Sequence, residues 1–280
     1  MNEKLKKSVF ASPSGSQTLL VFLTVTGLFV AAGILRSSVA EGLMNAQLVR
    51  AVPSLNVDVL RKFPHDPEAY TQGLLWWEGK LYESTGQYGR SDLRRVDPQT
   101  GDVERIAQIS PAYFGEGLAR IEERLVMLTW KAQRALVHDL ESFNQLATLR
   151  YRGEGWGLCN DGRRLVMSDG SDQLTFRSLE SFEITGRVSV TLQGQPLTQL
   201  NELECVGGSV YANVYQTEVL VRIDPGSGRV TQTIDASGLL TRSEARGVDV
   251  LNGIAYDPAA KTFYITGKLW PLMFEVRFSK

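Results

Sequence analysis

Five residues recur at equivalent places in a short motif that the sequence repeats. Each stands two positions before an apolar residue that is followed by a polar turn, and they are Gln72, Glu116, Trp156, Asn201 and Asn252. Equivalent positions of a circular repeat face one common axis, so these side chains would place hydrogen-bonding groups and an indole around one mouth of a central channel. Such a cluster could bind a small polar ligand and move protons on it.

Glu116 is the strongest candidate for proton transfer. It lies between Phe114-Gly115 and Gly117-Leu118, an apolar and glycine-rich setting. Removal of a carboxylate from water raises its pKa, which suits the group to proton exchange near neutrality. The alternative for the amide residues of the ring is that they only solvate the channel and cap strand ends.

Aromatic and cationic residues follow the second strand-like run of several repeats. Trp130 and Tyr215 stand there, and Lys268 lies in the stretch Thr266–Pro271. Aromatic side chains beside a few polar groups are the usual make-up of a small-ligand pocket. The alternative for Trp130 is packing between neighbouring repeats.

The spacing of the motif predicts the architecture that must position these residues. Its apolar residues stand at 74, 118, 158, 203 and 254, so successive copies are 44, 40, 45 and 51 residues apart. A period of about 40–50 residues is typical of the blades of a β-propeller. A β-sandwich, the alternative, does not explain this period.

Each motif is followed by a run of strand-forming residues, at 81–84, 125–128, 165–168, 210–213 and 263–266. No segment beyond residue 40 sustains the 3.6-residue period of a helix. We therefore predict an all-β fold, a five-bladed β-propeller over residues 54–280. The alternating segment Ser54–Phe63 precedes the first repeat, and we expect it to add the outermost strand of the last blade and so close the ring.

The N-terminal segment has the three parts of an export signal. Lys4, Lys6 and Lys7 precede an uncharged apolar run from 19 to 35, and Ser38-Val39-Ala40 places small residues at a cleavage site. We predict a signal peptide over residues 1–40 and a linker over 41–53. An apolar run of 17 residues is at the lower limit for a membrane span, so an uncleaved anchor is the alternative. Either way, the chain is expected to be exported, to the periplasm or as a secreted protein.

Charge and composition exclude several classes of function. The whole chain has a formal net charge of −1, and residues 1–40 hold four basic and one acidic residue, so the remainder carries −4. A nucleic-acid-binding protein needs a basic surface, so this negative charge argues against nucleic acid as a partner. Two histidines in the whole chain nearly exclude a histidine-rich zinc site. Cys159 and Cys205 could pair in an exported protein, but two separate buried side chains are the preferred interpretation.

Nine stretches of the sequence, taken in order, resemble the glutamine cyclotransferase family of plants and bacteria. They are residues 63–67 with 70–74, 83–86 with 88–89, 114–117, 128–131, 154–158, 168–171, 200–204, 251–255 and 266–271. Each stretch is short, but nine in one order are specific, and the resemblance extends from residue 57 to the C-terminus.

The resemblance implies a five-bladed propeller that converts the N-terminal glutamine of peptides and proteins into pyroglutamate and releases ammonia. It implies that Glu116 is the catalytic acid/base. Tyr70 stands where the family usually has Phe. Tyr215 stands where many members have Trp, and this smaller phenol is expected to alter the pocket wall. The residues that the resemblance assigns to substrate binding are Tyr70, Gln72, Phe114, Trp130, Trp156, Asn201, Tyr215 and Lys268.

This reaction leads us to expect no cofactor and no catalytic metal, because the substrate carries both the nucleophile and the leaving group. A structural divalent cation in the channel is left open. The expected partners are peptides or proteins with N-terminal glutamine, and the expected state is a monomer. Two alternatives are a non-enzymatic peptide-binding propeller and a metal-dependent propeller hydrolase such as a lactonase, for which the ring holds few carboxylates.

Overall fold

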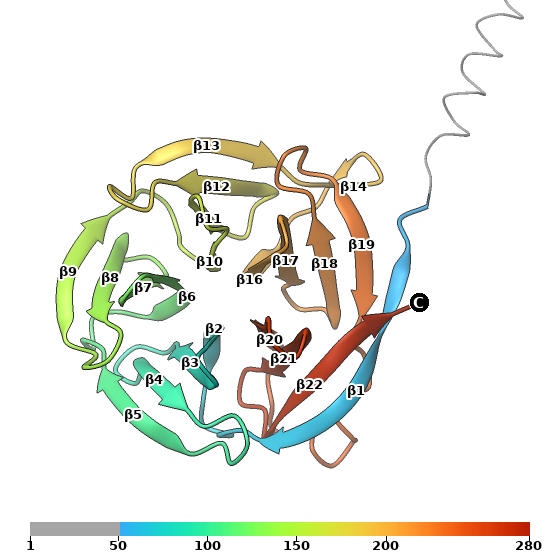
Figure 1. The fold of residues 1–280 in the computed structure, drawn as a ribbon, viewed down its shortest axis with the longest axis horizontal. Helices are drawn as coiled ribbons and strands as arrows, with labels where there is room; N and C mark the ends of the chain where they lie inside the picture. Colours follow the sequence, from blue (N-terminus) through green and yellow to red (C-terminus); the bar gives the residue numbers. More distant parts are fainter. Residues whose placement is uncertain (1–50) are drawn as a thin grey trace, which may run out of the picture. The chain divides into compact units, whose positions relative to one another are not determined.

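A computed structural model describes residues 51–280 (Figure 1). The predicted signal peptide, and all but the last three residues of the predicted linker, lie outside the described residues. The described residues form twenty-two β-strands and no helix, which confirms the all-β prediction. Accordingly, this part of the chain contains no helix of the length and apolarity needed to cross a membrane.

Three sheets each consist of four consecutive strands with antiparallel neighbours. The first holds β2 (Thr71–Trp77), β3 (Lys80–Thr85), β4 (Asp92–Val96) and β5 (Val103–Gln108). The second holds β6 (Gly115–Ile121), β7 (Arg124–Thr129), β8 (Arg134–Asp139) and β9 (Gln145–Arg150). The third holds β10 (Leu158–Asn160), β11 (Leu165–Met167), β12 (Gln173–Arg177) and β13 (Ile184–Ser189).

The remaining long strands form one eight-stranded sheet in the order β16-β17-β18-β19-β1-β22-β21-β20. Its members are β16 (Leu200–Val206), β17 (Ser209–Val214), β18 (Val219–Ile223), β19 (Val230–Asp235), β20 (Leu251–Asp257), β21 (Thr262–Gly267), β22 (Leu272–Ser279) and β1 (Ser54–Pro64). A separate small hairpin holds β14 (Thr191–Leu192) and β15 (Gln195–Pro196).

The strand β1 joins the two halves of this large sheet. It runs antiparallel to β22, with Asn56 opposite Ser279, and it also pairs with β19 in parallel over three residues. The chain thus uses its first described strand as the outer strand of its last unit, β20-β21-β22-β1. The predicted outer-strand position of Ser54–Phe63 beside the last strands of the chain is confirmed.

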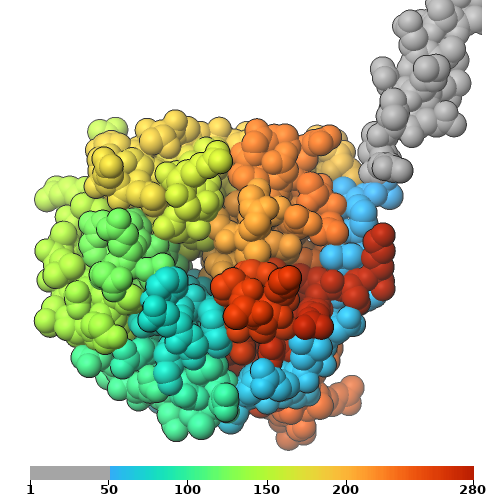
Figure 2. Space-filling model, viewed as in Figure 1, coloured from blue at the N-terminus to red at the C-terminus, as the bar shows by residue number. Residues whose placement is uncertain are grey.

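The first strand of each unit lies near the centre of the described residues, and the fourth strand lies at the perimeter (Figure 1). Each inner strand contacts the next in the order β2, β6, β10, β16, β20, and β20 contacts β2. Figure 2 shows the units meeting around a narrow central opening. The predicted strand-forming runs fall on the second strands, β3, β7, β11, β17 and β21, except that Ser168 lies just beyond β11.

The glycine of the repeated motif is required by the close approach of neighbouring inner strands. A Cβ atom on Gly73 would lie 2.5 Å from the backbone nitrogen of Leu118, and one on Gly117 would lie 2.5 Å from that of Leu158. Neither contact is sterically possible, so a larger residue would push the strands apart.

The fourth inner strand carries Glu202 in place of this glycine. The Glu202 side chain is fully buried, and its two carboxylate oxygens accept the backbone N–H of Leu74, at 3.2 Å, and of Ile254, at 2.8 Å. The carboxylate therefore connects β16 to β2 and β20 across the centre. Burial raises the pKa of Glu202 well above its usual value, the nearby Glu204 raises it further, and the two N–H donors act in the opposite direction.

The apolar core lies between neighbouring units rather than at the centre. One cluster joins Leu118 of β6 to Leu93 of β4, and another joins Leu158 of β10 to Val126 of β7. Each unit is thus held by the faces of the two beside it. Burial of apolar area at these faces is the main stabilising contribution.

A disulfide joins Cys159 of β10 to Cys205 of β16, with Cα atoms 5.5 Å apart. The interpretation of two separate buried thiols was wrong. The two cysteines are 46 residues apart in sequence but lie on adjacent inner strands, so the close packing of those strands brings them within bonding distance.

We expect the double variant Cys159→Ser/Cys205→Ser to lose roughly 2–4 kcal/mol of unfolding free energy, because the bond restricts the unfolded chain. Urea unfolding with and without reductant measures this. The reductant should destabilise the wild type and leave the variant unchanged. If the wild type and the variant have equal free energies of unfolding without reductant, the disulfide contributes nothing to stability.

Candidate active site

The nine residues predicted to form the site all lie at the same end of the inner hairpins. Tyr70 and Phe114 immediately precede β2 and β6, and Trp156 shortly precedes β10. Trp130, Tyr215 and Lys268 immediately follow the second strands β7, β17 and β21, while Gln72, Glu116 and Asn201 lie at the start of inner strands. The start of one strand and the end of its antiparallel neighbour lie side by side, so the topology gathers these positions at one mouth of the ring.

A single cavity of about 230 Å³ is lined by all nine of these residues. Its volume is below the range of about 300–1,000 Å³ for pockets that hold drug-sized ligands, so it is suited to one side chain. The buried part of its lining is polar and the half-buried part is aromatic. The polar residues are Gln72, Glu116, Asn201 and Lys268, and the aromatic ones are Tyr70, Phe114, Trp130, Trp156 and Tyr215.

Glu116 lies in the buried polar part and is 5% exposed. Burial raises the pKa of Glu116 well above its usual value, the positive charge of Lys268 acts in the opposite direction, and Glu154 adds to the increase. Nε2 of Gln72 donates to Oε1 of Glu116 at 3.3 Å. The carboxylate can therefore take up and release a proton at a higher pH than an exposed glutamate would.

Lys268 is 3% exposed and forms no ion pair or side-chain hydrogen bond with any residue from 51 to 280. Its Nζ lies 5.0 Å from the ring centres of both Tyr70 and Tyr215. Burial lowers the pKa of Lys268, while Glu116 and Asp249 act in the opposite direction. A buried ammonium with unused donors beside the carboxylate is suited to stabilise negative charge on a ligand.

Local irregularities of the sheets place the polar ring residues. The pairing of inner with second strands shifts its register at Gln72, Glu116, Asn201 and Asn252. A bulge removes a residue from the regular ladder and redirects its side chain. Three of these bulges direct the side chains of Gln72, Glu116 and Asn201 into the cavity. The apolar residue two positions later, such as Leu74 or Leu118, remains in the core.

Asn252, the fifth ring residue, does not line the cavity. It is fully buried, and its Nδ2 donates to the Thr71 carbonyl at 3.0 Å and to Oε1 of Gln72 at 3.5 Å. Asn252 therefore orients the amide that donates to Glu116. This agrees with a supporting role and not with contact to a ligand.

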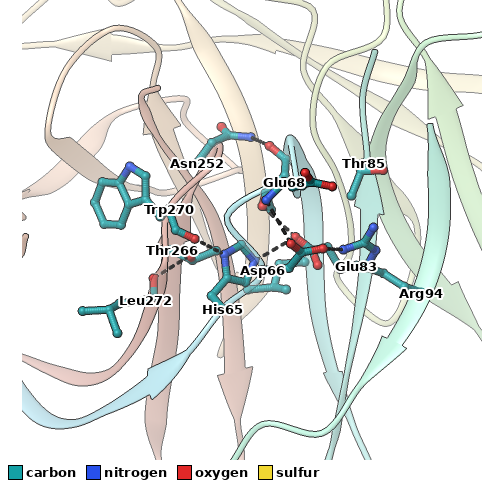
Figure 3. Close-up of polar contacts among 12 residues, drawn as sticks. His65, Asp66, Glu68, Glu83, Thr85, Arg94, Asn252, Thr266, Trp270 and Leu272 are labelled. Carbon is teal, nitrogen blue, oxygen red and sulfur yellow. Dashed lines mark hydrogen bonds and ion pairs between the residues drawn. The ribbon is translucent and has the colours of Figure 1, made fainter. Parts of the chain in front are cut away.

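A buried polar network connects Asn252, through Thr71, to Glu83 and His65 (Figure 3). Thr71 Oγ1 donates to Glu83 at 2.6 Å, and the same carboxylate oxygen is 3.1 Å from Nε2 of His65. Burial lowers the pKa of His65, but the charge and hydrogen bond of Glu83 outweigh it and the net pKa is raised. The network holds Thr71, and with it the adjacent Gln72, through a buried ion pair.

Sequence reasoning missed Glu154, although it lies in the stretch that carries Trp156. Its Oε2 accepts the indole N–H of Trp130 at 2.7 Å and of Trp156 at 3.0 Å. One carboxylate thus fixes two walls of the cavity. Only the spatial neighbourhood of the two indoles reveals this, since Trp130 and Glu154 belong to different units.

Sequence reasoning also missed Asp249, which precedes the last inner strand. The hydroxyl of Tyr70 donates to Oδ2 of Asp249 at 2.9 Å. A phenylalanine would lack this contact, so Asp249 provides the partner for the phenol at this position. The pKa of Tyr70 is raised, by burial first and then by Asp249.

Within residues 51–280, no group of three or more His, Cys, Asp or Glu side chains is arranged to hold a metal ion. What the cavity does offer is a proton carrier, Glu116, beside amide and ammonium donors and an aromatic enclosure.

Comparisons with known proteins agree with the resemblance. The family model described as glutamine cyclotransferase matches residues 29–278. The glutaminyl-peptide cyclotransferase of Arabidopsis thaliana is 38% identical over 229 residues, which cover 80% of this chain and 72% of that protein. The crystal structure of Myxococcus xanthus glutaminyl cyclase matches with a TM-score of 0.74 and 38% identity, over 82% of this chain and 99% of the other.

The family model covers most of the chain, and the Arabidopsis relative is well above the identity at which a shared fold and family are secure. The chain belongs to the glutamine cyclotransferase family.

Proposed function

We propose that this protein is a glutaminyl-peptide cyclotransferase, which closes N-terminal glutamine to pyroglutamate with release of ammonia. The observation that carries the proposal is the buried carboxylate of Glu116, set among amide and ammonium donors in a cavity of about 230 Å³ with aromatic walls. The names of both relatives favour this function over a peptide-binding or lactonase-like alternative.

The reaction is intramolecular. The α-amine nitrogen attacks the γ-carboxamide carbon, a C–N bond forms to close a five-membered ring, and the bond to the amide nitrogen then breaks. The aromatic walls restrict the flexible side chain to conformations close to attack. Glu116 accepts the proton that the attacking amine loses and delivers one to the departing ammonia, so the carboxylate is restored in each cycle.

A negative charge develops on the former amide oxygen during attack. Three donors lie near, but the Gln72 amide already donates to Glu116. Neither the Nζ of Lys268 nor the Nδ2 of Asn201 donates a hydrogen bond to any described residue, and both residues line the cavity. We assign the oxyanion to Lys268 with support from Asn201, a contribution of about 3–4 kcal/mol for such donors.

Four broader proposals accompany this function. Five units around a closed ring of inner strands support a five-bladed propeller. The disulfide supports export, since such bonds persist outside the cytoplasm. N-terminal sequencing of the native protein checks this, and the sequence is expected to begin near Glu41.

Catalysis needs no metal by the scheme above, so activity should survive a chelator. The working unit is one chain, and its sedimentation coefficient checks this.

Substrate scope provides the main test. Among four peptides that differ only at the first position, Gln should lose 17 mass units, whereas Asn, Glu and acetyl-Gln should not under the same conditions. Asparagine would have to close a strained four-membered ring, glutamate carries a poor electrophile, and acetyl-Gln has no free amine. Mass spectrometry measures the products, and equal conversion of acetyl-Gln would refute attack by the α-amine.

The variant Glu116→Gln tests the proton carrier. It should fold normally, because burial already favours a neutral side chain at this position, and it should lose at least about 100-fold in kcat. Glu123→Gln, an exposed change in the turn at the other end of β6, is the matched control and should leave kcat unchanged. Near-normal turnover by Glu116→Gln would remove this residue from the mechanism.

The pH dependence tests the pairing of Glu116 with Lys268. Glu116 must be ionised to accept a proton, so kcat falls as the pH drops through its pKa. Lys268 lowers that pKa, so Lys268→Met should move the acidic limb of the kcat profile to higher pH, by about one unit or more. Lys261→Met removes the same charge at the opposite end of the β20–β21 hairpin and should leave the limb in place. A limb that stays in place in Lys268→Met would contradict the coupling.

A further inference from the structure

A second and larger hollow lies between the sheet β6–β9 and the sheet β10–β13. Its volume is about 650 Å³, and five arginines line it, namely Arg134, Arg150, Arg152, Arg177 and Arg187. We call it the arginine groove. Glu154 also lines it, and the same carboxylate holds the indoles of Trp130 and Trp156, which wall the catalytic cavity. The groove therefore begins where the wall of the active site ends.

Much of the positive charge in the groove has no protein partner. Arg150, Arg152 and Arg187 are exposed and form no ion pair or side-chain hydrogen bond with any described residue. The other two are already engaged, since Arg134 donates to the Gln133 carbonyl and Arg177 donates to that of Phe182.

Carboxylates do not balance these arginines. The groove is lined by three acidic residues, Glu154, Asp169 and Glu183, against five arginines, which leaves a net charge of +2. Beyond residue 40 the chain carries −4 overall, from −1 for the whole chain less +3 for residues 1–40. The groove is thus a positive feature on an acidic molecule.

The arginines also repel one another. Arg134 and Arg150 are direct cross-strand partners in the β8–β9 pairing, an arrangement of like charges that destabilises a sheet. Burial lowers the pKa of Arg177, and the nearby Arg187 contributes to the decrease. An anionic ligand in the groove would relieve this repulsion.

We propose that the arginine groove binds acidic side chains of the segment that follows the N-terminal glutamine of a substrate. The proposal rests on the function proposed above, because only the first residue fits the small cavity and the following residues must leave over its rim. Glu154 forms the rim on the side of the groove. Guanidinium groups pair with carboxylates in a forked geometry and attract acidic peptides at a distance.

The test compares three glutaminyl peptides that have acidic, neutral or basic residues at positions two to six. The wild type should show the lowest KM for the acidic peptide, and the difference should shrink at high salt. The double variant Arg150→Glu/Arg187→Glu should raise the KM of the acidic peptide roughly tenfold, with kcat and the turnover of glutaminyl-glycine unchanged.

The matched control is Arg105→Glu/Arg163→Glu, which makes the same charge change at exposed positions outside the groove. It should leave the preference for acidic peptides intact. An equal loss in this control, or equal KM values for all three peptides on the wild type, would overturn the proposal.

Direct binding separates this proposal from the proposed function. The acidic peptide with its amine acetylated cannot cyclise, and fluorescence anisotropy should show that it binds the wild type about tenfold more tightly than the groove variant. This result would support peptide binding in the groove even if no peptide were turned over. An absence of turnover would refute the proposed function alone. Displacement by inorganic phosphate at equal concentration would indicate a small-anion site and overturn the proposal.

Discussion

The close approach of the inner strands is the constraint on which the rest of the structure depends. Neighbouring strands at the centre pass so near that Gly73 and Gly117 have no room for a side chain. The same approach brings Cys159 and Cys205 within bonding distance, and it leaves a centre narrow enough for Glu202 to connect three strands. It also brings the starts of the inner strands together, which creates the mouth where the site lies.

The site combines this packing with charges that water would otherwise solvate. Glu116 and Lys268 are both nearly fully buried, and each has its pKa shifted toward the neutral form by burial while the charge of the other opposes that shift. Desolvation of these two groups is costly, and interactions that stabilise the inner strands, such as the hydrogen bonds of Glu202, must offset it. Stability at the centre thus supports reactivity at the mouth.

The repeat and the family resemblance together predicted the all-β fold, the closing strand β1 and all nine residues of the cavity. The repeat period shows which positions of the five units are equivalent, and equivalent positions lie together around the centre of the ring. The period does not show where bulges occur. The displacement of Gln72 from the face of Leu74 was therefore not predictable from the two-residue alternation of a strand. Contacts between units, such as those of Glu154, depend on distances that no local pattern encodes.

The pairing of β1 with β22 has a consequence for how the chain acquires its structure. The two strands come from opposite ends of the described sequence, so the ring can close only after the last strand is available. A contact between residues so far apart in sequence slows folding, because the intervening chain must first be ordered. Until then the edge of β1 that β22 covers remains unpaired. A newly made chain would therefore expose this strand edge until β22 has been synthesised, and an exposed edge can pair with another chain.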